Sequence, residues 1–255
     1  MFFEADSNQV DWIGRMPSAS GHIRGWAPSE YDTTVIMLNP ITLIHRDDDG
    51  VWKSPMAWAE VAERVGIDPN ALRSGYPKLD PLRDAAARHL DPNDNVEWPQ
   101  QGETAVVVRA AIARAVVTER NRVGTVGFYL GGHGGFDADW LASPMVVREV
   151  GQLQYGFVGC RLGSFFDAWT HHNQQIPDGF DSPEVSFVWP DNGNWFVNID
   201  PDSCFATLSG GGEIAGGLLN DQSVETWHAD DANPWGQHYP GSTPRFTSYR
   251  IERRG

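Results

Sequence analysis

Residues 185–199 read VSFVWPDNGNWFVNI, and this stretch decides the fold class of the chain. Two apolar runs rich in β-branched and aromatic residues, 185–189 and 195–199, flank a polar segment that contains Asn192-Gly193. Asn-Gly favours a tight hairpin turn because both residues tolerate positive φ. The stretch therefore predicts an antiparallel β-hairpin in the C-terminal half of the chain.

Outward from this hairpin, strand-like and helix-like segments follow one another irregularly. Apolar, β-branched runs predict strands at 33–38, 123–130, 152–160 and 224–228, and an edge strand at 245–251. Helical spacing and start signals predict helices at 55–65, 81–90, 104–120 and 209–220. In the first of these, Ser54 is the expected N-cap and Gly66 the terminator. The irregular order predicts an α+β fold with a mixed or antiparallel sheet and packed helices.

The 255 residues suffice for one large domain or two small ones. We expect a single α+β body over 1–255, with 1–100 and 101–255 as the alternative subdivision, because residues 68–102 are rich in Pro, Asn and Asp. The best-patterned elements predict a core that contains Trp58, Val61, Val65, Val107, Ile112, Val116, Phe128, Phe187, Trp195 and Val197.

The charge of the chain is distributed unevenly. The net charge is −15, and twelve Asp and Glu but no Lys or Arg lie between Arg161 and Arg245. An anionic surface repels phosphate backbones, so we expect no nucleic-acid partner. It attracts a cationic protein, while the plainer alternative is that the acids serve solubility. The 11 Trp residues fit either a core or a recognition surface, and the core is favoured.

The sequence predicts a cytoplasmic protein without membrane association. No apolar stretch reaches the roughly 18–20 residues of a membrane span, and residues 1–6 lack the features of a secretory signal. The two cysteines, Cys160 and Cys204, have no metal-binding or redox spacing. We expect two buried free thiols, with a single disulfide between them as the alternative.

A glycine-rich segment, 131–137, follows a predicted strand and precedes a helix-like stretch. Its candidate ligand-binding residues are Gly132, His133, Gly134 and Asp137, because glycines allow close approach and a helix N-terminus favours an anion. His133 and Asp137 are four residues apart and would suit a base and its orienting carboxylate. The alternative is a turn or bulge that needs positive φ.

Asp200 and Asp202 are the other ligand-binding candidates, because paired carboxylates can hold a cation. A proline-containing turn is the favoured alternative there. The adjacent histidines at 171–172 would point apart in a strand. No nucleophile elbow, phosphate-binding loop or dinucleotide fingerprint is present, so we predict no catalytic residues, no metal and no cofactor.

Several segments resemble an uncharacterised actinobacterial protein family with Trp-Pro-Asp, Trp, Asp and Gly-Gly landmarks and no known activity. The matching segments are 31–41, 58–62, 128–132, 188–200, 209–211 and 218–219. Members usually carry an acidic residue where this chain has Asn198. Residues 128–137 also resemble the strand–loop–helix turn of the SLOG nucleotide-binding superfamily, which implies nucleotide binding at the glycine-rich segment.

These observations favour a non-enzymatic interaction protein of the immunity or regulator kind. It would present an acidic, Trp-rich surface in its C-terminal half to a cationic protein partner. The alternative is a nucleotide-binding protein or small enzyme that uses the segment 131–137. The sequence leaves the oligomeric state open.

Overall fold

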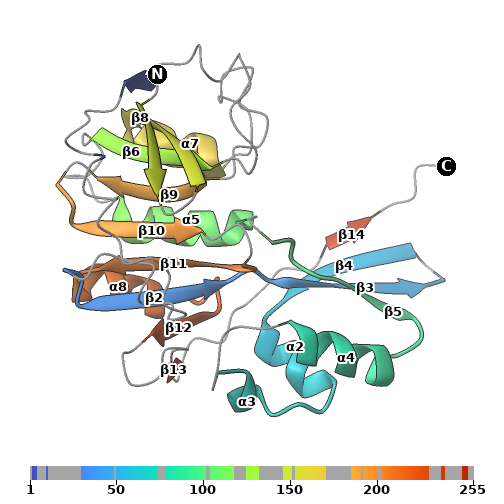
Figure 1. The fold of residues 1–255 in the computed structure, drawn as a ribbon. Helices are drawn as coiled ribbons and strands as arrows, with labels where there is room; N and C mark the ends of the chain where they lie inside the picture. Colours follow the sequence, from blue (N-terminus) through green and yellow to red (C-terminus); the bar gives the residue numbers. More distant parts are fainter. Residues whose placement is uncertain are drawn as a thin grey trace.

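The protein has an α+β fold built on two antiparallel sheets, as the predicted class requires (Figure 1). The computed structural model describes residues 2–4, 10, 30–48, 50–73, 79–101, 104–117, 125–131, 146–150, 153–170, 185–190, 192–199, 203–229, 237–238 and 249–251. None of the helices in these ranges is both long and apolar enough to cross a membrane.

The larger sheet has ten strands in the order β1-β8-β6-β9-β10-β11-β2-β12-β13, with β7 paired to β8. Its strands are β1 (Phe2–Glu4), β2 (Thr33–Leu38), β6 (Thr125–Gly131), β7 (Val146–Val150), β8 (Leu153–Arg161), β9 (Val185–Pro190), β10 (Trp195–Ile199), β11 (Phe205–Gly210), β12 (Thr226–Ala229) and β13 (Gln237–His238). The predicted hairpin is β9–β10, and Gly193 in its turn has φ +64°. The hairpin prediction is therefore confirmed.

The smaller sheet has four strands in the order β14-β4-β3-β5. They are β3 (Ile41–Asp47), β4 (Gly50–Met56), β5 (Asp94–Glu97) and β14 (Tyr249–Ile251). Helices α2 (Trp58–Arg64), α3 (Pro69–Arg73) and α4 (Asp80–His89) gather on one side of it (Figure 1). The predicted edge strand at 245–251 is thus found as β14, at the edge of this second sheet.

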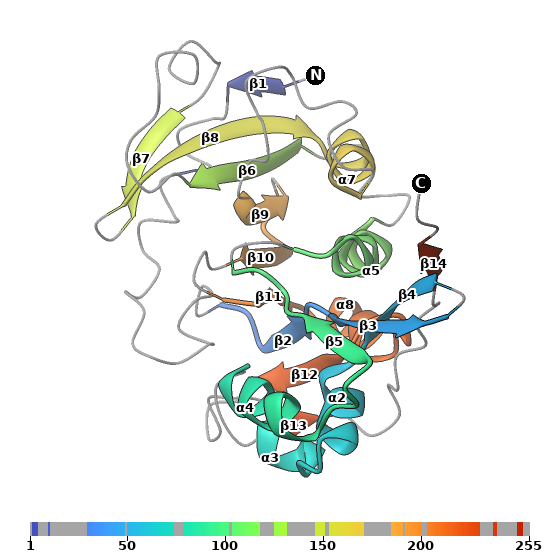
Figure 2. The same ribbon diagram turned by 90° about the vertical axis from the view of Figure 1, so that its right-hand side faces the viewer.

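Two apolar cores lie on opposite faces of β2. Because side chains alternate along a strand, Val35 and Met37 face one core while Ile36 and Leu38 face the other. The first core is closed by α5 (Val106–Val116), α7 (Leu162–Thr170) and α8 (Gly212–Leu219), and Figure 2 shows α5 and α7 on the same side of the strands. The second core lies under α2 and α4.

β2 comes from the first hundred residues, yet it pairs with β11 on one side and β12 on the other. The chain continues from β2 into β3 of the smaller sheet after only Asn39 and Pro40. The two sheets therefore share one continuous segment at the middle of the fold. The domain assignment itself, one body or 1–100 and 101–255, stays a prediction.

Two element predictions were wrong in their boundaries. Ser54 and Pro55 do not begin a helix but lie in β4, and α2 starts at Trp58 after the N-cap residue Ala57. Pro55 is compatible with the strand because β14 pairs with β4 only at Val51–Lys53, so among the described strands Pro55 has a neighbour on the β3 side alone. Similarly, Ser209 and Gly210 end β11, so α8 starts only at Gly212.

The predicted core is largely confirmed. Trp58, Val61, Val65, Ile112, Val116, Phe187, Trp195 and Val197 are buried. Val107 is only half-buried, because the inward face of α5 is set by Val108, Ile112 and Val116 at a spacing of four. The side chain of Phe128 lies outside the described residues.

Candidate functional site

The residues that the sequence singled out for ligand binding lie outside the described part of the chain. They are Gly132, His133, Gly134, Asp137, Asp200 and Asp202. The described strands reach only to their borders, since β6 ends at Gly131 and β10 ends at Ile199. A role for these residues stays a prediction.

The described acidic residues between 162 and 244 contribute only in part to the protein surface. Of its members in the described ranges, Asp167 and Glu213 are exposed, Asp221 is half-buried and Glu225 is buried. The fate of each carboxylate depends on its strand or helix partners, which the sequence does not reveal.

Three of the exposed acids lie at one end of the larger sheet. Gly210 at the end of β11 is the cross-strand partner of both Trp195, where β10 begins, and Thr33, where β2 begins. Just before Thr33 the chain exposes Glu30 and Asp32, and just after Gly210 helix α8 exposes Glu213 in its first turn. We call Glu30, Asp32 and Glu213 the acidic end of the sheet.

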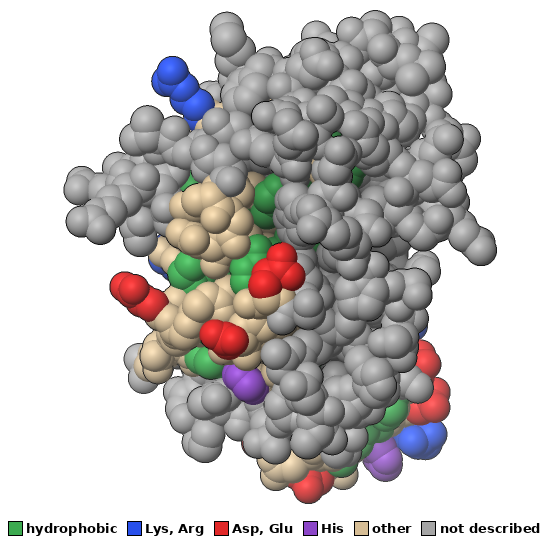
Figure 3. All heavy atoms as spheres, turned by 60° about the vertical axis from the view of Figure 1, so that its left-hand side comes forward, with side chains coloured by type: hydrophobic (Ala, Val, Ile, Leu, Met, Phe, Trp, Pro, Cys, Tyr) green, Lys and Arg blue, Asp and Glu red, His purple; other side chains and the backbone are tan. Residues whose placement is uncertain are grey.

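Figure 3 turns forward the side of the molecule where β2 begins in Figure 1. Acidic side chains lie there among backbone, uncharged polar and hydrophobic atoms. The exposed neighbours of the acidic end include Asn192, Gly193 and Asn194 of the hairpin turn and the two glycines that lead into α8. Short side chains leave the carboxylates accessible to a partner.

Tyr31 fixes the acidic end to the β9–β10 turn. Its hydroxyl donates a hydrogen bond of 2.8 Å to the carbonyl oxygen of Gly193, while its ring is buried. Burial, and secondarily the negative charge of Glu30, raise the pKa of Tyr31 well above its ordinary value, so its hydroxyl stays a donor. Glu30 and Asp32 are thus held on either side of an anchored residue.

The Trp-rich surface stays a prediction, but the described Trp side chains of the C-terminal half do not contribute to it. Trp189, Trp195 and Trp227 are all buried. Trp189 packs edge-on against Phe157 and Trp195 packs against Phe166, so both serve the core. Strands β9, β10 and β11 are buried on both faces. Large aromatic rings fill the space on these faces and bury much apolar area there.

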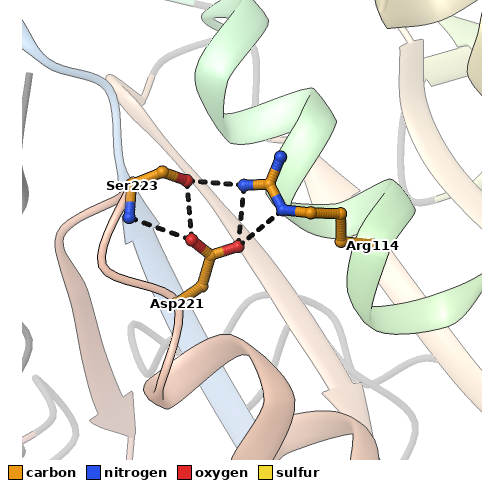
Figure 4. A network of polar contacts seen from close by, with 3 residues as sticks. All are labelled: Arg114, Asp221 and Ser223. Atoms are coloured by element: carbon orange, nitrogen blue, oxygen red, sulfur yellow. Dashed lines mark hydrogen bonds and ion pairs between the residues drawn. The ribbon is translucent and has the colours of Figure 1, made fainter. Parts of the chain in front are cut away.

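A second polar cluster joins Arg114, Asp221 and Ser223 (Figure 4). Arg114 donates to Asp221 Oδ2 from Nε at 3.0 Å and from Nη2 at 2.7 Å, and also to Ser223 Oγ at 2.5 Å. Asp221 Oδ1 accepts from the backbone and hydroxyl of Ser223. Burial alone would raise the pKa of Asp221, but the hydrogen bonds from Ser223 and Arg114 lower it.

This cluster suits a structural role. Arg114 lies on α5, while Asp221 and Ser223 lie in the turn between α8 and β12, so the contacts tie a helix to a turn. A guanidinium cannot act as a base toward the serine at physiological pH. The cluster also neutralises Asp221 and removes it from the acidic surface.

Glu225 is removed from that surface in another way. Its Oε2 accepts hydrogen bonds from the backbone N–H groups of Trp58 at 2.6 Å and Ala59 at 3.4 Å, which are the first residues of α2. A carboxylate is stabilised at a helix N-terminus by the unpaired N–H groups and the helix dipole. No sequence motif marks Glu225 for this position, because it reaches α2 from a distant part of the chain, directly before β12.

Comparison with known proteins identifies no relative: no family model, no curated protein and no solved structure matches this chain. The resemblance to an actinobacterial family therefore stays a prediction. In the part of the chain that the structure describes, no group of three or more His, Cys, Asp or Glu side chains is arranged to hold a metal ion.

Proposed function

We propose that this protein is a non-enzymatic binding protein whose acidic end meets a cationic protein partner. The observation that carries the proposal is the gathering of exposed Glu30, Asp32 and Glu213 at one end of the sheet. The segments that build this end, 30–33, 192–194 and 210–213, contain no Lys or Arg. A partner with clustered Lys or Arg is the class that such a surface recognises.

Electrostatic complementarity of this kind acts mainly on the rate of encounter. A charged patch raises the association rate and does so less as salt rises, because the Debye length shortens to about 8 Å at 0.15 M ionic strength. Phosphate-bearing partners are repelled by the same field, which favours a protein over a nucleic acid. The net charge of −15 adds a general attraction that any test must separate from the local one.

The test compares two triple variants with equal change of charge. The first is Glu30→Gln, Asp32→Asn and Glu213→Gln; the control, which changes exposed acids elsewhere, is Asp48→Asn, Glu63→Gln and Asp84→Asn. Association with a fluorescent oligolysine peptide is followed by stopped flow at low and at physiological salt. We expect the first variant to slow association about threefold or more, and the control clearly less.

Equal slowing by both variants would contradict the proposal, because it would mean that only net charge matters. The alternative, nucleotide binding by the segment 131–137, stays a prediction. A saturable rise of melting temperature with added nucleotide, abolished by His133→Ala, would favour it over the binding protein proposed here.

A further inference from the structure

A histidine–aspartate contact ties β5 to β3 in the smaller sheet. His45 and Asp94 are direct cross-strand partners, and His45 Nδ1 lies 2.5 Å from Asp94 Oδ1. The side chain of Asp94 is 12% exposed and that of His45 is 45% exposed, so the imidazole meets solvent while its partner is sheltered. Residues directly opposite on antiparallel strands share a face, which makes this contact a bridge between the two strands.

The strand that this bridge holds is short and lies at an edge. β5 has four residues and, among the described strands, pairs with β3 alone. A second side-chain tie within the described ranges is the ion pair between Lys53 Nζ and Glu97 Oε2 at 2.7 Å. Such ties add to the stability of a short edge strand, because it has few ladder partners. Of the two ties, only the one with histidine titrates near neutral pH.

The surroundings of His45 are anionic. Asp94 and Asp91 come from β5 and the turn before it, and Asp47 comes from the end of β3. On β4, Trp52 is the partner of His45, and its indole donates to Asp47 Oδ2. β14 places Arg250 in register with Trp52, one strand further from the histidine.

These groups shift the titration of His45 in a definite direction. The hydrogen bond to Asp94 raises its pKa, partial desolvation opposes this, and the charges of Asp94, Asp47 and Asp91 raise it further. Folding therefore favours the protonated imidazole. The contribution of His45 to the stability of the fold is fully present below the ordinary histidine pKa of about 6.5. It is lost as the pH rises through the raised pKa that His45 has in the folded protein.

We propose that the His45–Asp94 contact is a pH-sensitive clamp on the edge strand β5. The clamp also bears on the segment that follows β5, because that segment is anchored to residues next to strands of the larger sheet. The Pro99 carbonyl oxygen lies 3.5 Å from Sγ of Cys204, which directly precedes β11. The Ala105 N–H donates to Oδ1 of Asn39, which directly follows β2, at 2.9 Å. β5 thus connects a titrating group in one sheet to the start of α5 on the other. This inference is independent of the proposed function.

The test measures amide hydrogen exchange of the full chain by NMR at about pH 6 and about pH 8.5, corrected for intrinsic rates. We expect the protection of the β5 amides, relative to amides shared by β3 and β4, to fall about two- to fivefold at the higher pH, the size ordinary for an exposed ion pair. Equal relative protection at both pH values overturns the proposal.

Two variants separate the clamp from general loosening of the strand. Asp94→Asn keeps the shape of the side chain but removes its charge, and we expect this variant to abolish the pH dependence of β5 protection. If β5 protection in Asp94→Asn still depends on pH, the proposal is overturned. Glu97→Gln should loosen β5 equally at both pH values. An NMR titration of His45 in the unaltered protein needs no variant, and a midpoint at or below the ordinary histidine value also overturns the proposal.

Discussion

At the scale of single residues, the buried carboxylate of Glu225 decides how α2 meets the larger sheet. One oxygen accepts two backbone N–H groups of the helix start, 2.6 and 3.4 Å away. We expect Glu225→Ala to lower the free energy of unfolding by about 2 kcal/mol, because hydrogen bonds to a charged group are lost in a buried place. Glu225→Gln keeps a hydrogen-bond acceptor and should lower the free energy of unfolding less than Glu225→Ala does. Urea unfolding measures both, with exposed Glu213→Ala as the control, and equal losses for Ala and Gln would contradict this role.

At the scale of elements, the β9–β10 turn and α8 place glycines in opposite conformational settings. Gly193 has φ +64°, where a Cβ is strained, whereas Gly216 lies inside α8; a Cβ at either position meets no atom within 4 Å. Only the backbone preference then differs, so we expect Gly193→Ala to destabilise by about 1 kcal/mol and Gly216→Ala to stabilise by about 0.5–1 kcal/mol. Melting temperatures of the two variants should move in opposite directions. A shift in the same direction would refute the assigned turn or helix.

At the scale of the whole molecule, β2 couples the two cores. Met37 belongs to the core under α5, α7 and α8, and its neighbour Ile36 to the core under α2 and α4; both are fully buried. Truncation of either to Ala should cost about 2–5 kcal/mol through lost burial and the cavity left behind. Because one strand serves both cores, we expect each variant to shift the whole unfolding transition, seen alike by tryptophan fluorescence and circular dichroism. Two transitions of which only one moves would instead support separate domains 1–100 and 101–255.

The sequence by itself determined the elements whose signals are local. The Asn192-Gly193 turn between apolar runs was enough for the hairpin, and β-branched residues were enough for β2, because turn geometry and strand patterning act over a few residues. The helix expected at 81–90 is found as α4. Of the mixed and antiparallel sheets that the sequence left open, the structure has the antiparallel arrangement. The strands β3 and β4 were missed because charged residues such as Arg46 and Lys53 interrupt their apolar pattern.

Only the tertiary structure decided which residues of distant segments meet. The sequence shows an acidic surplus, but burial of Glu225 against α2 and pairing of Asp221 with Arg114 depend on contacts more than a hundred residues apart. The acidic end likewise exists only because the register of β2, β10 and β11 brings Glu30, Asp32 and Glu213 to one end of the larger sheet. Local propensity carries no information on such pairings, since they are fixed by how whole strands and helices bury their apolar faces together.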